Sequence, residues 1–154
     1  MFAGFSFSSK GFQHAISEVK TDGSYRIIER ELSRNPAPGL IRESANWLHD
    51  NFEEIFQRHD IARVGFKAHF KLMTINDLYA HGLPIGVLAS FCAERDIPVD
   101  GFTVGKIKSY KFLGLNKGEN TLTWVDAELH DAALYWTNDA KYSVAIASHL
   151  AISH

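Results

Sequence analysis

The sequence has little cysteine and no long hydrophobic run, and each shortage excludes a class of protein. Its single cysteine, Cys92, has no second cysteine with which to form an internal disulfide, so the cross-linked framework of small secreted proteins is excluded. Because Cys92 lies in an apolar stretch, a buried and unreactive thiol is expected there. The longest nearly apolar run, residues 83–93, contains Pro84 and is too short to span a bilayer. We therefore expect a cytoplasmic protein without membrane insertion.

The chain also lacks an excess of positive charge. Sixteen Lys and Arg residues against 18 Asp and Glu residues give a formal net charge of -2. Proteins that bind nucleic acid mainly through its phosphates usually carry a positive field, because counterion release supplies much of their affinity. This balance makes nucleic-acid binding less favoured, although a local basic stripe is compatible with a nearly neutral total.

The remaining composition is typical of a folded domain. Hydrophobic residues make up 45% of the 154 residues and aromatic residues 12%, which excludes general disorder. The length is sufficient for one ordinary domain with a substantial core, whereas two domains would each be undersized. We expect a single domain over residues 1–154.

Alternation in the N-terminal third predicts an antiparallel meander. Residues 1–8 alternate Ala3, Phe5 and Phe7 with glycine and serine, and two further strands are expected over 12–19 and 25–29. Short turns rich in Gly, Ser and Asp separate the three strands.

After a Pro- and Gly-containing break at 35–39, helical and strand patterns follow each other. A helix with apolar residues at helical spacing is expected over 41–56. A strand is expected next over 62–66, then a helix over 74–94 and a strand over 97–102. Three further helices are expected over 104–113, 121–136 and 138–152. Pro84 is expected to kink the helix that contains it.

This order of elements predicts the fold class. A β-meander that continues into βαβ units gives an α/β fold with a mixed five-stranded sheet, first antiparallel and then parallel, and with helices on both faces. Such a layout is that of the ribonuclease H-like fold.

Six short segments, in order along the chain, are similar to segments of one enzyme family. They are Gly-Phe-Ser-Phe-Ser-Ser-Lys-Gly-Phe at 4–12, Val-Gly-Phe-Lys-Ala-His-Phe at 64–70, Ala-His-Gly-Leu-Pro-Ile-Gly-Val-Leu at 80–88, Ile-Pro-Val at 97–99, Val-Gly-Lys-Ile-Lys at 104–108 and Asn-Asp-Ala-Lys-Tyr-Ser-Val-Ala-Ile-Ala-Ser-His at 138–149. Together they resemble RuvC-type Holliday junction resolvases over nearly the whole chain. The resemblance implies the ribonuclease H-like fold and a relationship to homodimeric enzymes that hydrolyse phosphodiesters with metal ions.

The same resemblance indicates that the catalytic carboxylates are missing. Active resolvases hold their metal ions with four carboxylates, one on the first strand, one after the fourth and two on the last helix. The matching positions here hold Ser6, Lys67, Asn138 and Lys141. A shift of one residue would bring Asp139 into place, but one carboxylate is insufficient for two divalent ions. We therefore expect a protein that is not an enzyme, without a metal site or cofactor.

No other motif points to catalysis. Eight histidines are present, but none forms His-x-x-x-His or His-Glu-x-x-His, so they are expected to be scattered core or surface residues. Phosphate-binding loops of the Walker type and the Gly-x-Ser-x-Gly elbow of serine esterases are also missing from the sequence.

Two sets of residues are candidates for binding. Four lysines, interleaved with aromatic residues, are the nearest approach to a basic patch: Lys106, Lys108, Lys111 and Lys117. They indicate either contacts with phosphates and bases or a solvated helix edge. Trp124, Tyr135 and Trp136 are candidate anchors for a protein partner, because aromatic residues are enriched in interface hot spots. The apolar helix over 78–91 is a candidate for the core or for a homodimer interface.

The leading hypothesis is a non-catalytic resolvase-like protein that acts as a recognition or adaptor factor for other proteins. Large bacteriophages carry divergent resolvase-like genes, and one such role is selective protein import into a phage nucleus-like compartment, in the cytoplasm of a bacterial host. The alternative is a protein that binds branched DNA without cutting it, or with residual metal-dependent nuclease activity.

Overall fold

A mixed five-stranded sheet forms the centre of the chain, which the computed structural model describes over residues 1–69, 74–129 and 137–154. The strands lie in the order β3-β2-β1-β4-β5. Their bounds are β1 Phe2–Ser8, β2 Gly11–Val19, β3 Tyr25–Arg34, β4 Arg63–Ala68 and β5 Val99–Thr103. The first three strands pair antiparallel, whereas β4 pairs parallel with both β1 and β5. The predicted mixed sheet is therefore confirmed.

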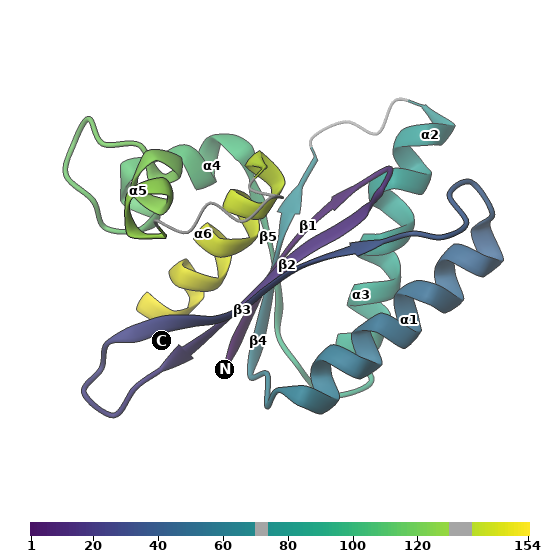
Figure 1. Ribbon diagram of the computed structural model, residues 1–154, viewed down its shortest axis with the longest axis horizontal. Helices are drawn as coiled ribbons and strands as arrows, with labels where there is room; N and C mark the ends of the chain where they lie inside the picture. Colours follow the sequence, from purple (N-terminus) through teal and green to yellow (C-terminus); the bar gives the residue numbers. More distant parts are fainter. Residues whose placement is uncertain (70–73, 130–136) are drawn as a thin grey trace.

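Helices cover both faces of this sheet (Figure 1). On one face lie α1 (Ile41–Arg58) and α3 (Leu83–Ala93). On the other lies α6 (Asn138–Ile152), flanked by the short helices α4 (Val104–Lys108) and α5 (Thr121–Glu128). No helix in the described ranges is long and apolar enough to cross a membrane.

The central strand β1 is buried on both faces because each of its alternating sets meets a helix layer. Ala3, Phe5 and Phe7 pack in the cluster that includes residues of α1 and α3. Gly4 lies on the opposite face, where a Cβ atom would be 2.1 Å from the carbonyl oxygen of Ser143 in α6. The missing side chain lets α6 approach the sheet closely, as its ten buried residues require.

Strand β3 is longer than the sequence pattern indicates. It was expected to end at Glu29 but continues to Arg34, opposite β2. β3 is an edge strand of the sheet, where polar side chains reach solvent while the backbone pairs with its neighbour. The polar composition after Glu29 therefore does not end the strand.

The helix expected over 74–94 is a chain of three helical pieces. α2 (Ile75–Asp77) begins at a capping box in which Thr74 and Asp77 bond each other, and the π-helical turn η1 (Leu78–Gly82) leads into α3. Pro84 has no N–H to donate to the carbonyl of Ala80, which favours the wider turn before it. The expected interruption at Pro84 thus takes the form of a π turn.

The expected helix over 104–113 is also divided. α4 ends at Lys108, Ser109 is extended, and the 3₁₀ turn η2 (Tyr110–Phe112) follows. By contrast, α6 has the bounds that the sequence predicted. In the other helix layer, Cys92 is buried, and burial raises the pKa of its thiol to about 11, so the thiol is in the unreactive protonated form.

Candidate functional site

Ser6, Lys67 and Asp139 meet where β1, β4 and α6 come together. Ser6 and Lys67 follow Phe5 and Phe66, which are the last paired residues of the parallel strands β1 and β4. Asp139 lies in the first turn of α6. The hydroxyl of Ser6 donates to Asp139 Oδ1 at 2.7 Å, and the ammonium of Lys67 donates to the same oxygen.

This group, called here the Ser6–Lys67–Asp139 cluster, is largely closed to solvent. Ser6 is fully buried, the side chain of Lys67 is 8% exposed and that of Asp139 is 33% exposed. The ammonium of Lys67 also lies 5.2 Å from the ring centroid of Tyr142, one turn further along α6. The negative charge of Asp139 is stabilised by its position in the first turn of α6, because the helix dipole favours negative charge at a helix N-terminus. The cluster therefore holds one negative and one positive charge in direct contact.

The other two positions implied by the resemblance lie apart from this contact. Asn138 is exposed at the first residue of α6, next to the capping Thr137. The ammonium of Lys141 bonds Asp126 of α5 at 2.7 Å instead of Asp139. The fold thus joins Ser6 and Lys67 through Asp139, which sequence matching placed one residue away from the implied position.

A stacked histidine pair adjoins the cluster, and sequence reasoning missed it. The rings of His69 and His81 have centroids 3.7 Å apart and planes 26° apart. Burial lowers the pKa of both imidazoles, and Lys67 lowers it further, so both rings favour the neutral state. His69 follows β4 and His81 lies in the π turn. The sequence gives no sign of the pair, because the two histidines are 12 positions apart and form no known motif.

A second polar cluster lies on the opposite face of the sheet, beneath the end of α1. Glu29 of β3 accepts hydrogen bonds from His14 Nε2 at 2.7 Å and from His59 Nε2 at 2.9 Å. The guanidinium of Arg58 also donates to Glu29, at 3.0 Å. The hydrogen bond from His14 is the largest influence on Glu29 and lowers the pKa of its carboxyl to about 2. Sequence analysis treated these histidines as scattered, whereas the fold brings two of them to one carboxylate.

The four lysines of the candidate basic patch are all exposed. Lys106 and Lys108 lie on α4, Lys111 in η2 and Lys117 in the following loop. Phe112, between them in sequence, is 4% exposed and packs in the core, whereas Tyr110 is half-buried. The stretch therefore presents ammonium groups to solvent on one side and apolar residues to α6 on the other.

Of the three candidate aromatic anchors, only Trp124 lies within the residues that the structure describes. Trp124 lies on α5, half-buried, and packs against the core beneath α6. Tyr135 and Trp136 lie outside the described residues. The helix expected over 121–136 is wrong in its extent, because α5 ends at Glu128 and its C-cap Leu129 is not helical.

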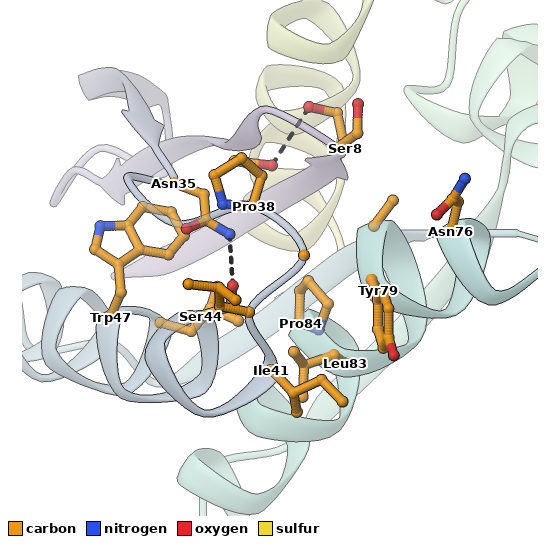
Figure 2. Close-up of a pocket in the computed structure, with 16 residues that line it drawn as sticks. Ser8, Asn35, Pro38, Ile41, Ser44, Trp47, Asn76, Tyr79, Leu83 and Pro84 are labelled. Carbon is orange, nitrogen blue, oxygen red and sulfur yellow. Dashed lines mark hydrogen bonds between the residues drawn. The ribbon is translucent and has the colours of Figure 1, made fainter.

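A pocket of about 470 Å³ opens between the start of α1 and the helical pieces α2, η1 and α3 (Figure 2). Trp47 and Ser44 of α1 line one side, and Tyr79 and Pro84 line the other. Asn35 donates to the Ser44 hydroxyl at 2.9 Å, which fixes the loop before α1. Every residue that lines the pocket in the described part of the chain is uncharged. We call it the uncharged pocket.

Two exposed aliphatic side chains line the uncharged pocket, and two more belong to residues next to lining residues in the chain. Leu40 and Ile41 line it and are 56% and 51% exposed, while Ile75 and Leu78 flank its other lining residues and are 67% and 48% exposed. Exposed aliphatic residues gathered around a concavity mark a surface for another molecule. The stretch over 78–91 is a candidate for the core or an interface, and its first residue, Leu78, is exposed.

Comparison with solved structures identifies the fold. Two structures of Thermus thermophilus RuvC, one of them in complex with a Holliday junction substrate, match with TM-scores of 0.76 and 0.77 at 17% and 16% identity. They cover 98% of this chain and 93% and 92% of their own. The yeast mitochondrial Holliday junction resolvase Ydc2 matches with a TM-score of 0.64 at 16% identity, over 98% of this chain and 77% of its own. The chain therefore has the ribonuclease H-like fold of RuvC resolvases, as the sequence predicted.

No protein-family model matches the sequence, and no curated protein matches it. At 16–17% identity, the likeness to the resolvases establishes the fold and leaves function to the residues of this chain.

Proposed function

We propose that this chain is a non-catalytic RuvC-like protein that recognises another protein through the uncharged pocket and its aliphatic rim. The observation that carries the proposal is the Ser6–Lys67–Asp139 cluster, in which a lysine ammonium and a buried hydroxyl both bind the one carboxylate. The resemblance to RuvC enzymes implies metal-binding carboxylates at this place.

Electrostatics makes the cluster a poor site for divalent ions. Lys67 already satisfies Oδ1 of Asp139, and Lys141 adds a second ammonium nearby that is paired with Asp126. Repulsion between a divalent ion and an ammonium 4 Å away costs about 8 kcal/mol at an effective dielectric constant of 20. Ser6 is fully buried, so its hydroxyl is out of reach of a substrate as a nucleophile. The cluster is therefore better suited to joining β1, β4 and α6 than to hydrolysis.

The uncharged pocket supports protein recognition rather than binding of phosphates. Its lining combines the aromatic rings of Trp47 and Tyr79 with hydroxyl and amide groups, and no charge has to be desolvated for a partner to enter. Leu40 and Ile41 line the pocket with more than half of their surface exposed. A partner that packs apolar side chains against them would bury aliphatic surface that is now in water.

Substitution of the pocket rim tests this proposal. With glutamate at both Leu40 and Ile41, affinity purification from the native cell is expected to recover at least about tenfold less of the partner protein. Each aliphatic side chain that is fully buried contributes about 1.5–3 kcal/mol, which the charged residue forfeits. Ile152→Glu is the matched control, since Ile152 is 49% exposed on α6, away from the pocket. Equal recovery of protein by both variants, or recovery of nucleic acid without protein, would contradict the proposal.

A second candidate function is the binding of branched DNA without cleavage. It is favoured by the exposed lysines on α4 and η2, and by the solved complex of Thermus thermophilus RuvC with a Holliday junction substrate. Lysine side chains that contact phosphates release counterions from DNA, so each lost contact weakens binding and reduces its salt dependence.

One assay on a labelled four-way junction separates the DNA hypotheses. We expect no cleavage with Mg²⁺ or Mn²⁺, because the ammonium of Lys67 bound to Asp139 repels a divalent ion at this place. Cleavage that disappears in Asp139→Asn would contradict the non-catalytic proposal. If the junction is shifted at low salt, replacing Lys106, Lys108 and Lys111 with glutamine is expected to reduce the slope of log affinity against log salt by roughly three. A shift unchanged by these substitutions would count against the second candidate.

The narrower hypotheses stay predictions. No described feature supports a role in protein import into a phage nucleus-like compartment. The hypothesis of a homodimer rests on the resemblance alone, and that of a location in the cytoplasm of the host cell rests on the composition.

A further inference from the structure

The polar cluster beneath the end of α1 gathers more ligand atoms than an ordinary ion pair needs. It contains His14 of β2, Glu29 and Glu31 of β3, and the pair Arg58 and His59 at the end of α1. We call it the His–Glu cluster. It lies on the face of the sheet opposite α6, and none of its residues belongs to the Ser6–Lys67–Asp139 cluster or lines the uncharged pocket.

We infer that the His–Glu cluster binds a divalent transition metal ion of the zinc type, with His14, Glu29 and Glu31 as ligands and His59 adjoining. One ligand atom from each of His14, Glu29 and Glu31 lies within 4.8 Å of the others. His59 Nε2 is 2.9 Å from the second oxygen of Glu29. Imidazole nitrogens combined with a carboxylate are a ligand set that Zn²⁺ accepts in proteins.

The backbone places these ligands firmly. His14 and Glu31 are direct partners in the antiparallel register of β2 and β3, and Glu29 lies two residues before Glu31 on the same face. His14 is fully buried, with its ring 5.9 Å from that of Phe5 and 6.0 Å from that of Phe12. Packing therefore holds its imidazole with Nε2 directed at Glu29.

Only small movements would open room for the ion. His14 Nε2 and Glu29 Oε1 are 2.7 Å apart as hydrogen-bond partners. Ligands of a tetrahedral zinc ion, each about 2.0–2.1 Å from the metal, lie roughly 3.3 Å from one another. Moving the partly exposed Glu29 carboxylate outward by about half an ångström reaches this spacing from His14. Nδ1 of His14 has no hydrogen-bond partner among the described residues, so the ring proton can move to it, and the ion then replaces the hydrogen bond between Nε2 and Glu29.

Arg58 places its positive charge beside both glutamates, where a bound ion would also lie. Its guanidinium is 3.0 Å from Glu29 and 3.7 Å from Glu31, and it neutralises part of their charge. The Arg58 side chain is 41% exposed and also lies 3.7 Å from Glu54, on the preceding turn of α1. Because it can turn outward to Glu54 and to water, it competes with the ion without blocking it. Removing this competitor should therefore strengthen metal binding.

Calorimetric titration of the full chain with Zn²⁺ alone tests the inference. One saturable site per chain is expected in the wild-type protein. Glu29→Gln and His59→Asn should each weaken binding about 10- to 100-fold, while Arg58→Gln should strengthen it. Glu18→Gln is the matched control, since Glu18 is a carboxylate of β2 that pairs with Arg26, and its loss should leave zinc affinity unchanged.

Circular dichroism confirms that each variant is folded before its affinity is interpreted. The Arg58→Gln variant separates a metal site in the His–Glu cluster from zinc bound elsewhere on the chain, because loss of Arg58 raises the zinc affinity only where the ion takes the same carboxylates. The inference is overturned if the wild-type chain shows no saturable zinc binding. It is equally overturned if Glu29→Gln and His59→Asn bind zinc as the wild type does, since the ion then occupies other residues. Neither result bears on the proposed recognition of a protein partner.

Discussion

Gly4→Ala is expected to prevent folding or to lower the free energy of unfolding by at least about 4 kcal/mol. The added Cβ would lie 2.1 Å from the carbonyl oxygen of Ser143 and 2.7 Å from the amide nitrogen of Ala147. Both atoms belong to the backbone of α6, so no side-chain rotation relieves the clash. The helix would have to move away from the sheet and uncover the apolar face that it buries.

Gly86→Ala is the matched control for this substitution. Gly86 lies within α3, where no atom beyond its chain neighbours and the backbone of its own helix is within 4 Å of an added Cβ, so alanine is expected to stabilise the helix by about 0.5–1 kcal/mol. Urea unfolding monitored by circular dichroism measures the free energy of unfolding of both variants. If Gly4→Ala is within 1 kcal/mol of the wild type, the close contact between β1 and α6 described here is wrong.

Asp139→Ala is expected to lower the free energy of unfolding by about 3 kcal/mol. Removing this carboxylate leaves the Lys67 ammonium, whose side chain is 8% exposed, without its counter-charge, and leaves the Ser6 hydroxyl without its acceptor. The figure is at the low end for a buried pair because Asp139 itself is 33% exposed and partly solvated. Lys67→Met is expected to cost less, since it removes the buried charge and keeps most of the volume.

Asp126→Ala provides the comparison, because it breaks the neighbouring pair with Lys141 at an aspartate that is 42% exposed. A loss of no more than about 1 kcal/mol is expected there. Urea unfolding at neutral pH measures all three variants. Equal losses for Asp139→Ala and Asp126→Ala would mean that the Ser6–Lys67–Asp139 cluster is solvated, and would weaken the case that it replaces a metal site.

Local patterns in the sequence determined most of the secondary structure. The alternation of Ala3, Phe5 and Phe7 identified β1, and α6 was predicted with its observed bounds, because each burial pattern repeats within a few residues of chain. The order of these elements was enough to predict the mixed sheet and the ribonuclease H-like fold. β3 was predicted too short because pairing with β2, which no local pattern reports, extends it through polar residues.

The sites depended on contacts that the sequence does not reveal. Sequence matching placed Ser6 and Lys67 together. That Lys67 binds Asp139, and Lys141 binds Asp126, follows from how α6 packs on the sheet. The stacking of His69 on His81 also joins residues from different elements.

Which segments form strands and helices, and in what order, follows from local residue patterns, because apolar periodicity is a property of neighbouring residues. Which charged groups meet depends on how the folded elements pack together. The bonds of His14 and His59 to Glu29 span 15 and 30 residues of chain, and that of Lys67 to Asp139 spans 72. Such distant groups are brought together by strand register and helix packing, which many residues set jointly.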